Sequence, residues 1–445
     1  MMIINKTSSK VSPFLIVIFL VALSFGLFFR LYYLDYMEFK GDESWILGNI
    51  VNFAKGGDLP STVVSSIGIP CAPFLYYILL PIAIFTQDLH YLVSYIAILN
   101  IMAAILAVYV FASWSSYKTS LLAISLYLLS PWGIIFSRKL WAPDLIFPLM
   151  MFFYFLLAIF SKTSSNYITQ KIVLFISSIL VLSFASQMHP SILFFMISFF
   201  ISMILFNKEY REIISYKVIL LLALAILVPA SYLIIQQAKI GFPIVAQLSL
   251  ILKNWMNNIN FNIMSFHYSY SIMTGIKFKF LMGSAWEIFK EEFPFWKFAI
   301  VRAIFLFQIL LSFSGVIILL SKIRIRNFSL VINGSNGSKE TYLAQLAVAS
   351  ILFVIAMGFS GVGIYPHYFI VLYPLQFVFA AFTITYLYEK ILSIRIKSSY
   401  YLLVSLFIIA SIHFNFNFYN FIIKNNGIDI SKYGGDYGPT NISKH

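Results

Sequence analysis

The stretch PFLIVIFLVALSFGLFFRLYYLDYMEFKGDESW, residues 13–45, decides the fold. Its first part, Pro13 to Leu34, is long and apolar enough to cross the hydrocarbon core of a bilayer as a helix. A basic start precedes it, as in a signal peptide, but the run is long for one and lacks a small-residue cleavage site, so we interpret it as an uncleaved span. Four acidic residues follow the run directly. We therefore predict a spanning helix that leads into an acidic segment on the other side of the membrane.

The composition of the whole chain agrees with a membrane protein. The chain has 445 residues, of which 61% are hydrophobic and 10% charged, whereas a soluble protein has roughly 25% charged residues. The lone cysteine, Cys71, excludes an intramolecular disulfide, and the lack of cysteine clusters disfavours a thiolate metal site. The net charge of +14 is better explained by membrane topology and lipid contacts than by nucleic-acid binding.

Apolar runs bounded by charge, proline or glycine predict about eleven spans and hence an all-α polytopic fold. The segment 73–85 is short and bracketed by prolines, so we expect an interfacial or re-entrant helix there. The spans are expected at 13–34, 91–111, 119–136, 145–160, 172–185, 192–206, 218–235, 298–320, 343–363, 369–388 and 401–418.

The distribution of charge predicts the orientation of these spans. With the N-terminus inside, the inner side holds 15 Lys and Arg residues against four acids, and the outer side holds 15 against 12. We expect a transmembrane core at 1–235, which includes the catalytic outer loop 35–89 and a second acidic outer loop, 137–144. An outer loop at 236–297 for donor or acceptor binding, C-terminal spans at 298–418 and a polar tail at 419–445 complete the predicted organisation; the inner segment 333–338 is expected to be a linker.

The first outer loop carries the densest acidic cluster. Asp42 and Glu43 open a predicted amphipathic surface helix, on which Trp45 follows and Gly56-Gly57 ends the run. The two carboxylates could simply favour the start of this helix. Paired carboxylates beside a membrane cavity are also suited to general-base chemistry on a hydroxyl.

The second outer loop combines two cations and an acid, Arg138, Lys139 and Asp144, within eight residues. One interpretation is interfacial anchoring, with the basic pair on lipid phosphates. The other is a site that binds a phosphate.

Together, Gly41-Asp42-Glu43-Ser44-Trp45 after the first span and Ser130-Pro131 through Pro143-Asp144 resemble the polyprenyl-dependent membrane glycosyltransferases of the GT-C class. The closest group is the protein O-mannosyltransferase and aminoarabinose transferase superfamily. Gln187-Met188-His189 and His367-Tyr368 resemble later features of that family, although a lysine is expected where His189 stands in the aminoarabinose enzymes. The resemblance implies a GT-C helical bundle, a sugar donor on a polyprenyl phosphate such as undecaprenyl phosphate, and an acceptor hydroxyl from the outer side.

The resemblance also implies residue roles. Asp42 would be the general base, Glu43 would orient the acceptor or tune that base, and Asp144 would be a second carboxylate. A single displacement would invert the anomeric carbon, with cations stabilising the departing phosphate. Expected phosphate contacts are Arg138, Lys139, His189 and His367.

The outer segment 236–297 would supply further contacts with the donor or the acceptor. A simpler interpretation is that this segment is an amphipathic loop in the headgroup region. A divalent metal at Asp42 and Asp144 would have a thin ligand set, so metal dependence stays open. The candidate donor or acceptor contacts are Lys277, Lys279, Arg302, Trp45 and His267.

The sequence leaves several functions open. We expect transfer to an envelope glycan such as lipopolysaccharide, O-antigen or a wall polymer, at a bacterial inner membrane with the site facing the periplasm or exterior. Alternatives are protein O-glycosylation, O-antigen polymerisation or ligation, and transport of a lipid-linked glycan. A transporter should carry charges within its spans or an internal repeat, and neither is evident.

Overall fold

The computed structural model confirms the all-α polytopic fold. Among the residues that it describes, nine helical stretches are long and apolar enough to cross a membrane. The structure describes residues 12–445 except 61–72, 165, 207, 240, 243–244, 247–248, 250–252, 254–259, 294, 327–328, 333–336, 362, 391–393, 428–436 and 440–445.

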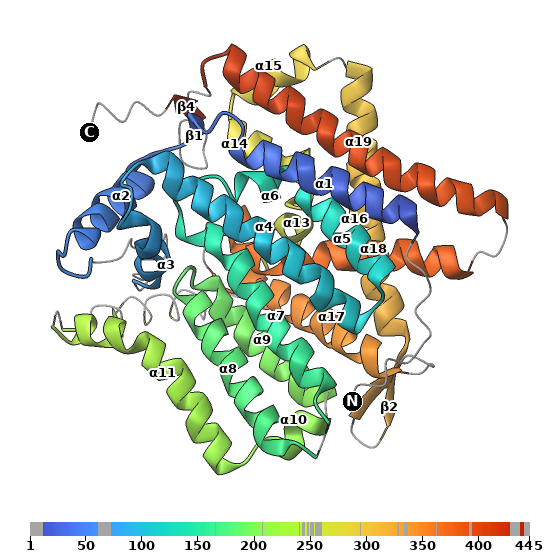
Figure 1. Cartoon of the computed structure of the whole chain (residues 1–445). Helices are drawn as coiled ribbons and strands as arrows, with labels where there is room; N and C mark the ends of the chain where they lie inside the picture. Colours follow the sequence, from blue (N-terminus) through green and yellow to red (C-terminus); the bar gives the residue numbers. More distant parts are fainter. Residues whose placement is uncertain are drawn as a thin grey trace.

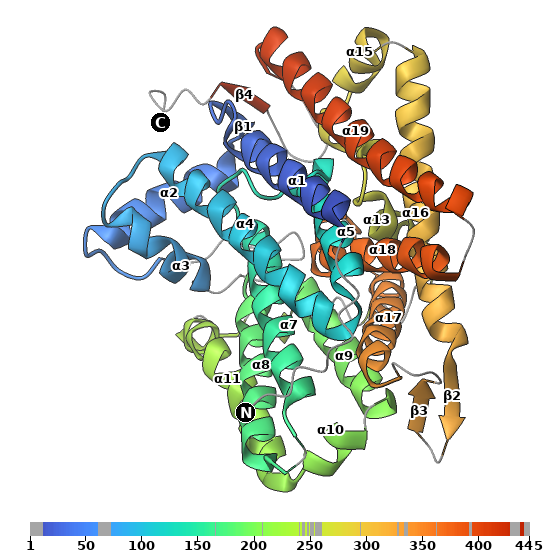
Figure 2. The same cartoon turned by 45° about the vertical axis from the view of Figure 1, so that its right-hand side comes forward.

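The long helices form a bundle whose ends carry different elements (Figures 1 and 2). In both views β1, β4 and α15 lie at one end, and β2 and α10 lie at the other. The helices of the bundle are α1 (Pro13–Leu31), α4 (Leu89–Trp114), α5 (Tyr117–Leu128), α7 (Ile146–Lys162), α8 (Ile168–Ser186), α9 (Ser191–Phe206), α11 (Tyr216–Lys239), α16 (Phe295–Ser321), α17 (Gly337–Gly358), α18 (Tyr373–Lys390) and α19 (Ile394–Lys424).

Short elements connect these helices. They are β1 (Tyr36–Glu38), α2 (Gly41–Ala54), α3 (Phe74–Ala83), α6 (Pro131–Ile135), η1 (Ala142–Leu145), α10 (Lys208–Ile213), α13 (Met264–Ser271), η2 (Gly275–Lys277), α14 (Lys279–Met282), α15 (Ala285–Glu292), β2 (Ile323–Arg326), β3 (Ser329–Ile332), η3 (Pro366–Leu372) and β4 (Tyr437–Pro439).

The expected span at 119–136 is divided into α5 and α6. Pro131 occupies the first turn of α6, where its missing N–H costs little. The Ser130 side chain accepts a hydrogen bond from the Gly133 N–H and so caps the new helix. Helix α5 is therefore only 12 residues long, shorter than the roughly 20 residues that cross a bilayer, and the chain continues from α6 into the predicted second outer loop.

The predicted amphipathic helix of the first outer loop is α2. It begins one residue before Asp42 and buries Ile46 and Ile50 on its inner face. Its N-cap is Lys40, whose backbone N–H donates to Glu43 Oε2 at 3.1 Å, so Glu43 rather than Asp42 closes the first turn. Gly56, with a φ of 87°, follows the helix in a conformation that favours glycine.

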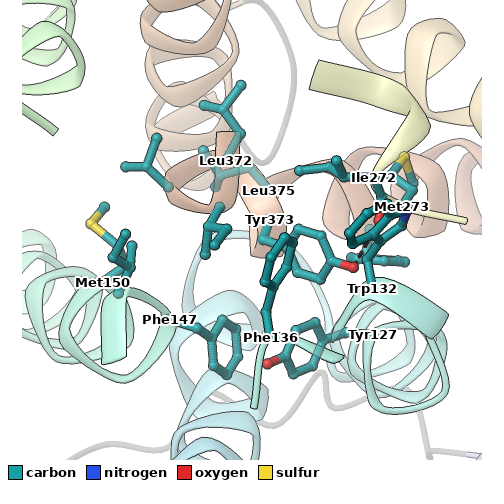
Figure 3. Close-up of a cluster of buried hydrophobic side chains, with 14 of the residues drawn as sticks. Tyr127, Trp132, Phe136, Phe147, Met150, Ile272, Met273, Leu372, Tyr373 and Leu375 are labelled. Carbon is teal, nitrogen blue, oxygen red and sulfur yellow. Dashed lines mark hydrogen bonds between the residues drawn. The ribbon is translucent and has the colours of Figure 1, made fainter. Parts of the chain in front are cut away.

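A buried aromatic cluster joins α5, α6 and α7 to η3 and α18 (Figure 3). Tyr127 stacks on Phe147 with ring centroids 4.1 Å apart. The Tyr373 hydroxyl donates to the Ile272 carbonyl at 2.7 Å and lies 2.8 Å from Ser130 Oγ, so the segment after α13 is attached to α6 and α18. These contacts fix the connection after α13 to the buried core of the bundle.

Part of the expected polar tail is ordered. Helix α19 continues to Lys424, and β4 pairs antiparallel with β1, with Glu38 opposite Tyr437. The tail thus reaches the strand that carries an acidic residue of the first outer loop. Most of the expected linker at 333–338 lies outside the described residues, and α17 begins within it at Gly337.

Candidate active site

Lys139 lies at the centre of a buried charged group that joins the two outer loops. Its Nζ is 2.9 Å from Glu38 Oε2 and 4.0 Å from Glu43 Oε1, and it lies 3.7 Å from the centroid of the Trp141 ring. Both carboxylate side chains and the lysine are at most 4% exposed. Together with Asp144 we call these residues, Glu38, Glu43, Lys139 and Asp144, the Lys139 cluster.

One carboxyl group of the cluster has a pKa close to neutral pH. Burial raises the pKa of Glu43 to about 7, and the attraction of Lys139 offsets this only in part. For Lys139, burial works against the charge, but Glu38, Glu43 and Asp144 outweigh it and raise the lysine pKa. Lys139 is therefore a permanent cation at neutral pH, whereas Glu43 can hold or release a proton.

Asp144 completes the cluster from η1, the short helix that leads into α7. Its side chain is 1% exposed, and neither carboxylate oxygen accepts a hydrogen bond from a residue that the structure describes. Its backbone carbonyl accepts from Asn100 Nδ2 at 3.0 Å, which fixes η1 against α4. A carboxylate that is buried without a hydrogen bond is costly, which is typical of a residue kept for function.

Two histidines from distant parts of the chain lie next to each other beside the cluster. The rings of His189 and His367 have centroids 5.0 Å apart, and the His367 ring lies 4.9 Å from that of Trp141. Burial lowers the pKa of His189 to about 3, so the ring is neutral. The Ser191 backbone N–H donates to His189 Nδ1 at 3.2 Å, which leaves the ring proton on Nε2 as a neutral donor.

Asp42 and Arg138, the predicted base and a predicted phosphate contact, differ in their burial. Asp42 is exposed at the start of α2, next to the buried Glu43. Arg138 is fully buried and donates to the carbonyls of Phe29, Tyr33 and Tyr36 at 2.6, 2.9 and 3.1 Å. Arg138 thus holds the turn between α1 and β1 through both terminal nitrogens of its guanidinium group.

The residues from the second long segment gather elsewhere. Lys277, Lys279 and Arg302 line one pocket of about 170 Å³, and Lys277 is close enough to contribute to the lowered pKa of His267, of which burial is the main cause. Trp45 projects from α2 and is 52% exposed. None of these side chains belongs to the Lys139 cluster.

Glu38 is the cluster member that our site prediction omitted. It comes from β1, a three-residue strand that pairs with β4 near the end of the chain. Its position among the four acids after the first span was the only available signal in the sequence. Within the described part of the chain, no group of three or more His, Cys, Asp or Glu residues is arranged to hold a metal ion.

The bundle has the GT-C type of fold, as comparison with solved structures shows. Two neighbours are structures of the oligosaccharyltransferase of Archaeoglobus fulgidus. One, tethered by a disulfide to an acceptor peptide with the NVT sequon, has a TM-score of 0.54 and 11% identity, covering 95% of this chain and 55% of that one. The other, the archaeal oligosaccharyltransferase AglB with an inhibitory peptide and a dolichol-phosphate, has a TM-score of 0.51 and 12% identity, covering 92% and 56%.

This chain spans just over half the length of these neighbours. No protein-family model matches it, and no curated protein sequence matches it. At this level of identity the likeness concerns the fold.

Proposed function

We propose that the protein is a membrane glycosyltransferase that moves a sugar from a polyprenyl-phosphate donor to a hydroxyl group on the outer side of the membrane. The main support is that the GT-C fold extends over nearly the whole chain and the Lys139 cluster joins its two outer loops. The AglB structure with a dolichol-phosphate supports a lipid-linked donor. The acceptor in this proposal is an envelope glycan in a bacterial inner membrane.

Asp42 is the proposed general base. Its exposed carboxylate would take the proton of the acceptor hydroxyl while the acceptor oxygen bonds to the anomeric carbon and the bond from that carbon to the phosphate oxygen breaks. The electron pair of the broken bond leaves with the polyprenyl phosphate, and the sugar is inverted. Glu43 is a positioning residue, because it closes the first turn of α2 and sits beside Lys139.

The departing phosphate is proposed to be stabilised by Lys139 and the two histidines. His189 would donate a hydrogen bond from its neutral Nε2–H. The positive charge of Lys139, which lies over the Trp141 ring, would stabilise the phosphate electrostatically. The chain therefore contributes preorganised dipoles and one buried cation. In this scheme Arg138 positions the turn between α1 and β1 rather than the phosphate, because the side chain is fully buried and both terminal nitrogens donate to backbone carbonyls.

The proposal is tested by measuring sugar transfer with purified protein in nanodiscs, supplied with a panel of undecaprenyl-phosphate sugars and envelope-glycan acceptors. We expect Asp42→Asn to lower kcat by about a hundredfold or more while the donor still binds. The matched control is Asp58→Asn, which changes an exposed acid of the same outer loop.

Near-normal turnover in Asp42→Asn would exclude Asp42 as the base. If no donor reacts with the wild-type protein, but the protein moves a lipid-linked glycan across vesicles, the transporter alternative would replace the transferase. Transfer only to a peptide hydroxyl would instead favour protein O-glycosylation.

A further inference from the structure

A second group of cations surrounds a pocket formed by η2, α14, α15, α16 and α19. The pocket has a volume of about 170 Å³ and an aromatic floor that includes Trp286, Phe305 and Phe414. Its lining shares no residue with the Lys139 cluster. We call it the basic pocket; its charged lining residues are Lys277, Lys279, Lys290 and Arg302.

The positive charge of this pocket is only partly balanced. Lys279 and Lys290 both pair with one carboxylate, that of Glu287, with a Lys279 Nζ to Glu287 Oε1 distance of 3.5 Å. Lys277 and Arg302 make no ion pair with any residue that the structure describes. The pocket lining thus holds four cations, of which two share the Glu287 carboxylate, so an anion is the complementary ligand.

An apolar groove continues from the basic pocket along α16. It has a volume of about 630 Å³ and shares Lys290, Phe298 and Arg302 with the pocket. Glu287 and Glu291 of α15 also border it, and Ala299, Ala303 and Leu306 line it from one face of α16, as their spacing requires. Leu306 is 48% exposed in a stretch that is apolar enough to cross a membrane, so this face meets hydrocarbon.

We propose that the basic pocket binds the phosphate head of a bilayer phospholipid whose hydrocarbon tail lies in the groove along α16. The arginine fork matches phosphate oxygens, and the lysines add charge around it. The two alanines leave room for a chain beside the helix. Because the groove opens on the exposed face of α16, its occupant exchanges with the bulk bilayer. The inference does not depend on the proposed transfer reaction.

The test uses the purified full chain in detergent, titrated with a phosphatidylglycerol that carries bromine atoms in its tails. Trp286 lines the pocket, and the difference in quenching between wild type and Trp286→Phe reports binding there. We expect the double variant Lys277→Gln/Arg302→Gln to bind about tenfold more weakly, because each lost charged hydrogen bond weakens binding. Lys239→Gln, which changes an exposed cation at the end of α11, should bind like wild type.

Three comparisons identify the ligand. Brominated diacylglycerol, which lacks the phosphate, should quench Trp286 much less, and inorganic phosphate, which lacks the tail, should compete only weakly. Equal quenching by diacylglycerol, or equal affinity in the double variant with an unchanged gel-filtration profile, would overturn the phosphate site. Displacement of phosphatidylglycerol by a far lower concentration of polyprenyl phosphate would overturn the phospholipid assignment in favour of the isoprenoid lipid.

Discussion

Lys139 is the residue on which the buried charges of the first outer loop depend. It is the cation nearest to both Glu38 and Glu43, at 2.9 and 4.0 Å. We expect Lys139→Met to lower the free energy of unfolding by about 3–5 kcal/mol, because it removes the buried cation of the cluster and leaves Glu38 with only the partly exposed Lys40, at 3.3 Å. The measurement is chemical denaturation in detergent, followed by the near-UV signal of the tryptophans.

The double variant Lys139→Met/Glu38→Leu separates this effect from lost packing. Removing the carboxylate as well should recover part of the loss, so the two effects should not add. Additive losses would show that the ion pair contributes little and that Lys139 acts mainly through its contact with Trp141.

Glu43 and His189 give the stability of the protein opposite dependences on pH. The folded protein keeps a proton on Glu43 up to about pH 7, whereas the unfolded chain loses it near 4.5, so this residue makes stability fall as pH rises between those values. Buried His189 rejects a proton that the unfolded chain binds below 6.5, so it makes stability rise from about pH 3 to 6.5. The two effects oppose each other over much of this range.

Relative to wild type, Glu43→Gln should therefore make stability rise more steeply with pH between 4.5 and 7, by up to roughly 3 kcal/mol over that range. His189→Gln should have the opposite effect below pH 6.5. Unfolding measured at several pH values checks both signs. Parallel curves for Glu43→Gln and wild type would mean that Glu43 is already charged in the folded protein.

At the scale of elements, α16 and α18 pack closely enough to need a glycine. A Cβ on Gly315 would overlap the Phe379 carbonyl and lie 2.9 Å from Thr383 Oγ1. Around this position Thr383 Oγ1 donates to the Leu311 carbonyl at 2.8 Å. We expect Gly315→Ala to destabilise the protein by about 1–3 kcal/mol, because the helices must move apart.

Gly48→Ala is the matched control, because a Cβ there has nothing within 4 Å and the residue lies inside α2. This change should be neutral or stabilising by up to about 1 kcal/mol. Thermal unfolding of the two variants measures the contrast. Equal stability of Gly315→Ala and wild type would mean that the two helices can separate without cost.

The sequence predicted these elements well where the physical signal is local. Apolar runs of about 20 residues placed nine of the eleven expected spans, whereas 119–136 is divided and α9 is shorter than a full span, and the pattern of an amphipathic helix placed α2. The meeting of His189 with His367 could not be predicted, since it depends on how the turn between α8 and α9 packs on η3. Nor could the sequence show that Lys139 turns to the carboxylates while Arg138 turns to the carbonyls of the preceding turn, because that depends on the fold of a short loop.

At the scale of the whole molecule, the distribution of charge and the fold both place the two predicted outer loops on the same side of the bundle. The count of Lys and Arg predicts that the first outer loop and the second face the same side. The structure brings Glu38 and Glu43 of the first into contact with Lys139 of the second. It places β1 and β4 at the end of the bundle opposite to α10 and β2 (Figures 1 and 2).

Cysteine labelling of cells tests which end faces outward. With Cys71 replaced by serine, a cysteine at Trp45 on α2 should react with an impermeant maleimide in intact cells, because that side chain is 52% exposed. A cysteine at Tyr216, 77% exposed at the start of α11, should react only after the membrane is opened. Reaction of Tyr216→Cys alone in intact cells would place the Lys139 cluster on the inner side. The acceptor would then have to come from the cytoplasm, which would remove the reason for an envelope glycan while leaving the proposed chemistry of Asp42 in place.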